Sequence, residues 1–296
     1  MRRADCLVAV AVLAAALAFP VSSSSEQKPA APVRKGSASR PIAPKPAAKP
    51  PAPEAMSREQ MRDFLLTAEV VSFKEIGKGV TRPQRLTLTK NGLTHDAAFQ
   101  SVDEQKQSNQ VGNSIELNFV DAYRYNLAAY AIAGLLDLEH MMPMYVERKW
   151  RGKTGSISWW VETMMDEGER LKKKIEPPNS RLWNEQMFRM RVFAALIRDT
   201  DRNMGNVLIT PDWKVMMIDF SRAFRLQPEL QHLADLAKID RRLLEKLETL
   251  TREDVDAAVK NFLIKREVDV MMQRRDLLVA HFKKLIAEQG ESKVLY

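Results

Sequence analysis

The most constraining feature of this sequence is a short polar turn that leads into a hairpin pattern. The turn reads Asp201-Arg202-Asn203-Met204-Gly205-Asn206. Two apolar runs follow it, separated by Pro211-Asp212, and the second run ends at Asp219. A two-stranded ribbon over these runs would bring Asn206 and Asp219 side by side, although they are thirteen residues apart. The sequence therefore predicts one site built from the turn and from Asp219.

The side chains of this site suit phosphoryl transfer, which needs a carboxylate to orient the acceptor hydroxyl and hard oxygen ligands for Mg²⁺. Asp201 can orient or deprotonate the acceptor, while Asn206 and Asp219 can supply metal-ligand oxygens. Asp199 is a second nearby carboxylate, which we interpret as a structural cap rather than the base. The alternative is a turn that only joins a helix to a hairpin, because Asp and Asn are ordinary turn residues.

The same residues resemble the atypical branch of the protein-kinase superfamily, which includes phosphatidylinositol 3- and 4-kinases, HipA-like bacterial kinases and secreted Golgi kinases. The first of these groups carries segments of the form Asp-Arg-His/Asn-x-x-Asn and Ile-Asp-x-Gly. This chain has the turn 201–206 and then Ile218-Asp219-Phe220-Ser221, so the second match is partial. The resemblance implies an α+β, two-lobed protein-kinase-like fold with a small antiparallel-sheet amino-terminal lobe and a mainly helical carboxy-terminal lobe.

The resemblance also implies roles for individual residues. Asp201 would be the catalytic base, and Asn206 and Asp219 the metal ligands, with ATP and Mg²⁺ as cofactors. Arg202 and Asn203 would support them. The activity would be transfer of the γ-phosphate of ATP to a hydroxyl of a protein or small molecule. A nucleotide-binding pseudokinase and a non-enzymatic envelope-associated binding protein are the alternatives.

The amino-terminal lobe departs from the family pattern at two positions. Kinases normally place a lysine at the end of the third strand, paired with a glutamate on the following helix; here these positions hold Gln100 and Asn126. Losing one partner of a buried ion pair costs roughly 3–5 kcal/mol, whereas replacing both can be nearly neutral. We expect Asn126 to support the site and Gln100 to contact the nucleotide.

The candidate phosphate contacts are the glycine turn Gly77-Lys78-Gly79, where backbone amides could approach an anion. Three alternatives follow from the missing lysine. Lys78 or Lys74 could reach the phosphates from a different strand, or the domain could bind nucleotide without transferring phosphate. The third is that Lys90 or Lys106 is the true equivalent.

The hydrophobic pattern of the rest predicts one folded region. Ser57 and Gln60 form a capping-box pattern for a helix from Ser57 to about Val70. A second, long helix is predicted from about Asp121 to Leu136, and the carboxy-terminal part is predicted to be mostly helical. The predicted strands cover 71–76, 85–90, 94–99 and 144–148, with an Asn91-Gly92 hairpin turn between the second and the third.

Residues 1–25 have the layout of an export signal, with Arg2 and Arg3 before an apolar stretch from Leu7 to Phe19. This stretch is shorter than the roughly 20 residues of a spanning helix, so cleavage is expected, and a retained membrane anchor is the alternative. Residues 26–56 are rich in Pro, Ala and Lys and predict a disordered linker. The predicted lobes are 57–158 and 159–296, and we expect an exported bacterial member, periplasmic or secreted.

The composition narrows the partners. Residues 1–57 hold eight Lys and Arg against three Asp and Glu, so most of the formal net charge of +8 lies outside the predicted fold. We therefore expect no nucleic-acid partner. The single cysteine, Cys6, excludes intrachain disulfides. The expected partners are a nucleotide and an unknown protein or small-molecule acceptor, with membrane contact only through an uncleaved N-terminal segment.

Overall fold

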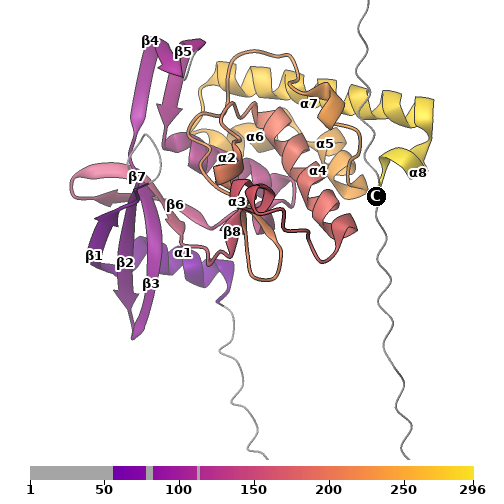
Figure 1. Cartoon of the computed structure of the whole chain (residues 1–296). Helices are drawn as coiled ribbons and strands as arrows, with labels where there is room; N and C mark the ends of the chain where they lie inside the picture. The colour runs from indigo at the N-terminus through magenta and orange to yellow at the C-terminus, as the bar shows by residue number, and fades with distance from the viewer. Residues whose placement is uncertain (1–55, 78–82, 112–113) are drawn as a thin grey trace, which may run out of the picture. The chain divides into compact units, whose positions relative to one another are not determined.

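The computed structural model describes residues 56–77, 83–111 and 114–296 (Figure 1). The predicted export signal, all of the predicted linker except Met56, and Lys78 and Gly79 lie outside these residues. The described chain contains an antiparallel sheet in its amino-terminal part and helices in its carboxy-terminal part. This architecture confirms the α+β, two-lobed fold.

The amino-terminal sheet has five strands in the order β1-β2-β3-β7-β6, and each neighbouring pair is antiparallel. The strands are β1 (Glu69–Glu75), β2 (Gln84–Lys90), β3 (Leu93–Gln100), β6 (Tyr145–Trp150) and β7 (Lys153–Trp159). Asn91 and Gly92 join β2 to β3, and both have positive φ, as a tight hairpin turn of this type requires. The four predicted strands and this turn are confirmed, with boundaries shifted by one or two residues.

Helix α1 (Arg58–Thr67) covers one face of this sheet. It begins after Ser57, whose hydroxyl accepts from the Gln60 amide while the Gln60 side chain accepts from the Ser57 amide, which is the predicted capping box. The buried Phe64 and Leu65 of α1 lie in one apolar cluster with alternate residues of β2. The helix ends three residues before the predicted Val70, because the chain enters β1 at Glu69.

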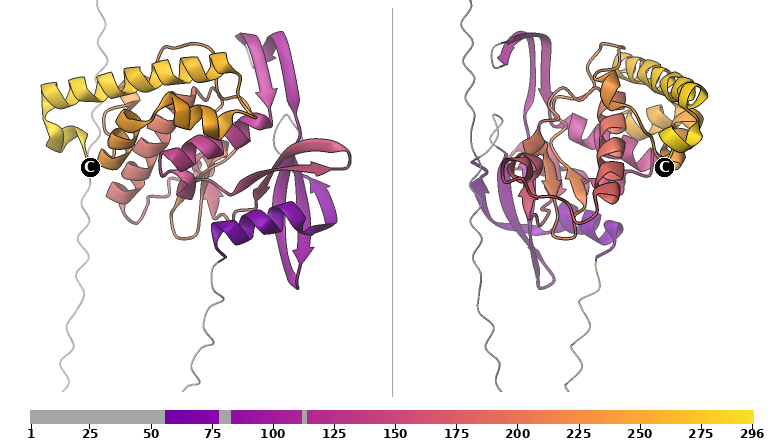
Figure 2. Two further views of the ribbon diagram at one scale, coloured as in Figure 1. Left: turned by 180° about the vertical axis from the view of Figure 1, so that it is seen from behind. Right: turned by 45° about the vertical axis from the view of Figure 1, so that its right-hand side comes forward.

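Helices form the larger core of the carboxy-terminal part. The long helices α4 (Ser180–Ile197) and α7 (Lys265–Gln289) pack against each other, and α7 also contacts α5 and α6 (Figure 2). Helix α2 (Arg124–Leu135) contacts both β6 and α6, so it links the sheet to this helical core. The other helices are α3 (Glu167–Lys172), α5 (Arg241–Thr249), α6 (Arg252–Val259), α8 (Glu291–Val294) and the short η1 (Glu139–Met141), η2 (Met204–Asn206) and η3 (Leu233–Asp235).

A second, three-stranded sheet carries the predicted hairpin, which follows α4 in the chain. Its order is β10-β9-β8, with β8 at Met165–Asp166, β9 at Val207–Ile209 and β10 at Val215–Met217. Strands β9 and β10 are antiparallel and pair Val207 with Met217. The Ile218 amide continues this ladder by donating to the Asn206 carbonyl at 3.1 Å. The ribbon predicted between Asn206 and Asp219 is therefore present.

A long hairpin, absent from the sequence prediction, separates β3 from α2. It consists of β4 (Asp103–Val111) and β5 (Ser114–Ala122), and it stands apart from the five-stranded sheet (Figures 1 and 2). Strand β4 has almost no apolar residues, so it carries little of the alternation that marks a strand. The helix predicted from about Asp121 to Leu136 is present as α2 (Arg124–Leu135), but it begins three residues later than predicted because Asp121 lies near the end of β5.

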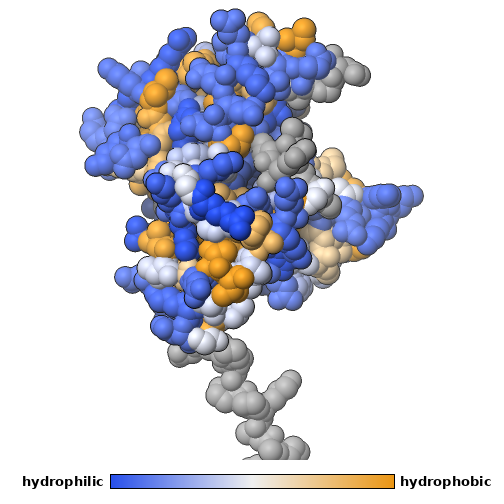
Figure 3. Space-filling model, turned by 90° about the vertical axis from the view of Figure 1, so that its left-hand side faces the viewer, coloured by the Kyte–Doolittle hydropathy of each residue, from blue (hydrophilic) through white to orange (hydrophobic). Residues whose placement is uncertain are grey.

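The face seen in Figure 3 is mostly hydrophilic and is broken by small apolar areas. Among the described residues, the large exposed apolar side chains include Val71 and Phe73 on β1 and Ile115 and Leu117 on β5. Within residues 56–77, 83–111 and 114–296, no helix is both long enough and apolar enough to cross a membrane.

Candidate functional site

The turn that follows α4 is organised by a buried ion pair. Arg198 ends α4 in the left-handed conformation, and the chain then runs through Asp199 to Arg202. The Asp199 carboxylate accepts from the Arg202 guanidinium, with Nε to Oδ2 at 2.8 Å, and from the Asp201 backbone amide at 3.1 Å. The side chain of Asp199 is fully buried and that of Arg202 is 8% exposed. Asp199 is thus committed to holding the turn, which matches its interpretation as a structural residue.

Arg202 also ties the turn to the end of β10. Its guanidinium donates to the carbonyl oxygens of Asn206 at 2.8 Å, Ile218 at 2.7 Å and Asp219 at 3.2 Å. The guanidinium lies 4.3 Å from the centre of the Phe220 ring, within cation–π range. One side chain therefore fixes the spacing between the two motifs found in the sequence.

Asp201 lies on the outer side of the turn, where its side chain is 37% exposed. Its Oδ1 accepts from Asn203 Nδ2 at 3.1 Å, and its Oδ2 is 3.7 Å from Arg222 Nη1. Asn203 in turn caps η2 by accepting from the Gly205 amide at 2.9 Å. The Asp201 carboxylate is therefore oriented by Asn203 and Arg222, and it remains partly exposed to solvent.

Asn206 is held so that its amide oxygen stays available. Its Nδ2 donates to the Asp201 backbone carbonyl at 3.0 Å. A side-chain amide has separate donor and acceptor ends, so Oδ1 can accept or ligate independently. The β9–β10 ladder places this residue next to the segment that carries Asp219.

Asp219 has a left-handed backbone with φ of 54°, a conformation that aspartate adopts more readily than most non-glycine residues. Its Oδ1 accepts from the Ser221 hydroxyl at 2.9 Å and from the Ser221 amide at 3.4 Å. Burial raises the pKa of Asp219 above its usual range, although the Ser221 hydrogen bonds oppose this. A nearby cation would favour the charged carboxylate.

The opposite wall of the site is neutral. Asn126, at the start of α2 and 1% exposed, donates to Gln100 Oε1 at 2.7 Å and to the Ser156 hydroxyl at 3.1 Å. Its Oδ1 accepts from the Phe220 amide at 2.7 Å. The two residues that stand at the predicted lysine and glutamate positions are thus in contact, and Asn126 binds the backbone directly after Asp219.

Two other lysines considered from the sequence are engaged elsewhere. Lys90 bonds Asp63 and Thr67 of α1, while Lys106 pairs with Glu104 on β4. Lys74 is exposed on the edge strand β1. These placements argue against Lys90 as the missing phosphate-binding lysine.

The predicted glycine turn is described only at its first residue. Gly77 is exposed, and its backbone does not require glycine, because its φ is not positive and a Cβ there would meet nothing within 4 Å. The Ile76 amide donates to the Pro83 carbonyl at 2.8 Å, which closes the base of the loop between β1 and β2.

The sequence reasoning missed a set of residues along β5 of the β4–β5 hairpin. Glu116 of β5 forms ion pairs with Arg222 and, at 2.7 Å, with Arg225. The Ala122 amide donates to the Ser221 carbonyl at 2.8 Å, so β5 is joined to the segment after Asp219. Between these contacts lies Asp121, whose pKa burial raises. The two arginines of the run Ser221-Arg222-Ala223-Phe224-Arg225 are a local sign that an acidic partner is needed, but they do not indicate that Glu116 is that partner.

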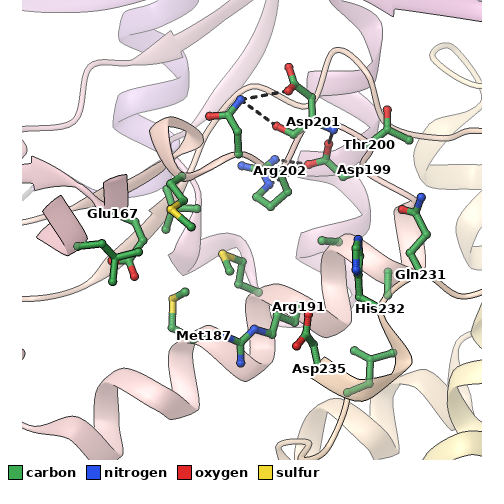
Figure 4. Close-up of a pocket in the computed structure, with 18 of the residues that line it drawn as sticks. Glu167, Met187, Arg191, Asp199, Thr200, Asp201, Arg202, Gln231, His232 and Asp235 are labelled. Carbon is green, nitrogen blue, oxygen red and sulfur yellow. Dashed lines mark hydrogen bonds and ion pairs between the residues drawn. The ribbon is translucent and has the colours of Figure 1, made fainter. Parts of the chain in front are cut away.

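A pocket of about 760 Å³ lies beneath the turn, between it and α4. Figure 4 shows Met187, Arg191, His232 and Asp235 around this space, and the Asp201 carboxylate points away from them. The pocket shares the backbone of the turn but not the face that carries the Asp201 carboxylate.

The sheet lobe, the linking helix α2, the polar turn after α4 and the Asp219 segment after the β9–β10 ribbon together define the protein-kinase-like class. Solved structures lead to the same class. A structure of hydra Fam20 with sugar aligns with a TM-score of 0.61 and 12% identity, over 81% of this chain and 92% of that one.

Two Golgi casein kinase structures are also similar. The structure with Mn/ADP bound aligns with a TM-score of 0.58 and 10% identity, over 80% of this chain and 78% of that one. A second aligns with a TM-score of 0.56 and 12% identity, over the same shares. No family model matches the sequence, and no curated protein matches it. At these identities the likeness shows the kinase-like fold.

Proposed function

We propose that this protein is a phosphotransferase that moves the γ-phosphate of ATP to a hydroxyl of a protein or small molecule. The observation that carries the proposal is the placement of Asp201, Asn206 and Asp219 around one turn, held together by Arg202. A turn that merely joined a helix to a hairpin would have no need for two carboxylates and an amide oriented in this way.

The residues present fit a divalent cation. The amide oxygen of Asn206 and the carboxylate of Asp219 are hard oxygen donors, and Asp219 is buried against a second carboxylate, Asp121. Mg²⁺ held there would neutralise charge on the transferred phosphate. A solved neighbour of this fold is described with Mn/ADP bound, which supports nucleotide and divalent-metal use.

The chain's own groups supply the remaining chemistry. Asp201 would accept the proton of the acceptor hydroxyl, with Asn203 and Arg222 holding its carboxylate in position. The Asp201 side chain is 37% exposed, so its carboxylate is accessible from solvent. A neighbour described with a sugar favours a hydroxyl-bearing acceptor.

A catalytically silent nucleotide-binding protein is the second candidate, and a specific contact favours it. Gln100 and Asn126 bond each other where kinases carry a lysine and a glutamate, so the described residues supply no cation at that position. Binding could then persist while transfer is lost.

The test is release of ADP and labelled phosphate transfer by the full chain with radiolabelled ATP and Mg²⁺. We expect native activity to fall about 10²- to 10⁴-fold in Asp201→Asn, the usual range for a general base. Asp212→Asn is the matched control, because Asp212 lies on the exposed turn between β9 and β10. ATP binding without phosphate transfer would favour the catalytically silent nucleotide-binding protein. If the chain does not bind ATP, both candidate functions are excluded.

We also propose that the chain is exported, from the layout of residues 1–25. The mass of the chain recovered from cells tests this: cleavage near residues 22–25 is expected, and an intact amino terminus in the cytoplasm would contradict it.

A further inference from the structure

Asp121 is a buried carboxylate that the fold leaves incompletely bonded. It is 6% exposed, near the end of β5, and its Oδ1 has no hydrogen-bond partner among the described residues. An unpartnered charged oxygen in such a place is costly, so protein interiors rarely keep one without a ligand or counterion.

The neighbour of Asp121 is the hydroxyl of Ser221. This hydroxyl donates to Asp219 Oδ1 at 2.9 Å, and it also lies close to the Asp121 carboxylate. A serine hydroxyl has one proton, so it can donate to only one carboxylate at a time. Its proton is given to Asp219, and Asp121 Oδ1 has no donor among the described residues.

The cations nearest to these acids already have partners. The Arg202 guanidinium is bound to Asp199 and to three carbonyl oxygens. Arg222 and Arg225 both lie close enough to attract Asp121, but both are paired with Glu116, and Arg222 also faces Asp201. Among the described residues, no lysine or arginine forms an ion pair with Asp121 or Asp219.

Backbone contacts hold both acids in place. The Ala122 amide donates to the Ser221 carbonyl, and Asn126 accepts from the Phe220 amide. The end of β5 and the start of α2 are thus both bonded to residues 220 and 221. These bonds hold the segments that carry Asp121 and Asp219 at a fixed separation. A cation bound by both carboxylates needs such an arrangement, because its coordinating oxygens must be in position before it binds.

We propose that Asp121 is a second carboxylate ligand of the divalent cation that Asp219 binds. The proposal rests on the function proposed above and names a residue of the same site. It gives the centre two carboxylates and the amide oxygen of Asn206, a donor set that suits Mg²⁺ or Mn²⁺ with nucleotide oxygens and water completing the shell. Asp121 thereby supplies, from β5, the negative charge that Asn126 lacks.

The experiment measures Mn²⁺ binding by electron paramagnetic resonance on the full chain, with and without ADP. We expect Asp121→Asn to weaken Mn²⁺ binding at least tenfold and Asp219→Asn to weaken it at least as much. Asp103→Asn is the matched control, because Asp103 lies on the same hairpin, is exposed and pairs with Arg124. Its Mn²⁺ affinity should equal that of the native chain.

A purely structural role for Asp121 makes a different prediction. In that case Asp121→Asn would bind Mn²⁺ as tightly as the native chain while Asp219→Asn does not, which would overturn the inference and leave the proposed function standing. If the native chain binds Mn²⁺ neither alone nor with ADP, both proposals fail. If it binds Mn²⁺ but no ADP, the proposed function fails and Asp121→Asn still decides the inference.

A second variant covers the case in which Asp121→Asn does not fold. Thiolates prefer soft metals, so Asp121→Cys should raise the preference for Cd²⁺ over Mn²⁺ at least tenfold if residue 121 is a ligand. An unchanged preference would overturn the inference. Thermal unfolding gives an independent readout: without metal, Asp121→Asn should be at least as stable as the native chain, but it should lose the Mn²⁺-dependent rise in unfolding temperature.

Discussion

The polar turn 199–206 and the wall formed by Gln100 and Asn126 use polar side chains in contrasting ways. In the turn, Asp199 and Arg202 form a buried, fully charged pair that organises the backbone. In the wall, Gln100 and Asn126 form a neutral pair at positions where kinases are charged. The turn therefore carries a buried ion pair, whereas the contact between Gln100 of β3 and Asn126 of α2 is uncharged.

This contrast predicts that substitutions in the turn and substitutions in the Gln100–Asn126 wall lower the free energy of unfolding by different amounts. A buried charge that loses its partner is expensive, whereas a neutral amide loses only a hydrogen bond. The turn should therefore be fragile to single substitutions, and the wall should be more forgiving.

The largest effect is expected for Arg202→Met. It leaves Asp199 buried without its cation and should lower the free energy of unfolding by roughly 3–5 kcal/mol, measured by urea denaturation. The double variant Asp199→Leu/Arg202→Met should recover part of this loss, because no buried charge is then left unpaired. Equal stability of Arg202→Met and the native chain would contradict the account of the turn.

A smaller effect is expected for Asn126→Leu in the wall. The Phe220 amide then loses its acceptor and Gln100 loses a donor, so we expect a loss of roughly 1–3 kcal/mol in the same measurement. Asn184→Leu, on an exposed position of α4, is the control and should change stability little. A loss as large as that of Arg202→Met would erase the contrast between the turn and the wall.

A third substitution probes the hairpin that closes the site. Glu116→Gln removes the charged partner that Arg222 and Arg225 share, and we expect a loss of about 1–2 kcal/mol, because these side chains are only 6–22% exposed but glutamine keeps an acceptor oxygen. Raising the salt concentration should narrow the difference between the variant and the native chain. A difference independent of salt would show that packing, rather than charge, holds β5 in place.

The smallest effect is expected for the pH dependence of stability, through the partly buried side chain of His95 in the amino-terminal sheet. Burial lowers the pKa of His95 below its ordinary value of 6.5, despite nearby Asp96, while Arg85 adds to the lowering. The ring stacks on Trp159 at 3.7 Å between centres. The unfolded chain binds the proton more readily, so this contribution to stability is complete above pH 6.5 and is lost as the pH falls toward the folded pKa.

Urea denaturation midpoints at pH 7.5 and 5.5 test whether acidification lowers stability through His95, as predicted. The native chain should lose more stability on acidification than His95→Phe, which keeps a ring for stacking and cannot be protonated. A larger acid-induced loss in the variant would show that the sign is wrong.

The sequence predicted the position of the polar turn beside the Asp219 segment because the contacts involved are local. Asp199, Arg202 and Asn206 lie within eight residues, and the hairpin that adds Asp219 has a clear turn and two apolar runs. Gln100 and Asn126 were paired only through the family resemblance, since nothing in their local sequence predicts contact.

Asp121 could not be found in this way. The predicted helix began there because an apolar helical pattern follows, and the preceding β4 sequence is too polar to indicate a strand. Its place beside Asp219 depends on the Glu116 ion pairs and on the bond from Ala122 to Ser221, which join residues about a hundred positions apart. Such long-range contacts have no periodic signature.

The most direct test of the central claim is calorimetric titration of the full chain with ATP, with and without Mg²⁺. The account predicts Mg²⁺-dependent binding that Asp219→Asn abolishes and Asp212→Asn preserves. Binding that is equal in Asp219→Asn, or no binding by the native chain, would contradict the assignment of this site as a metal-dependent nucleotide centre.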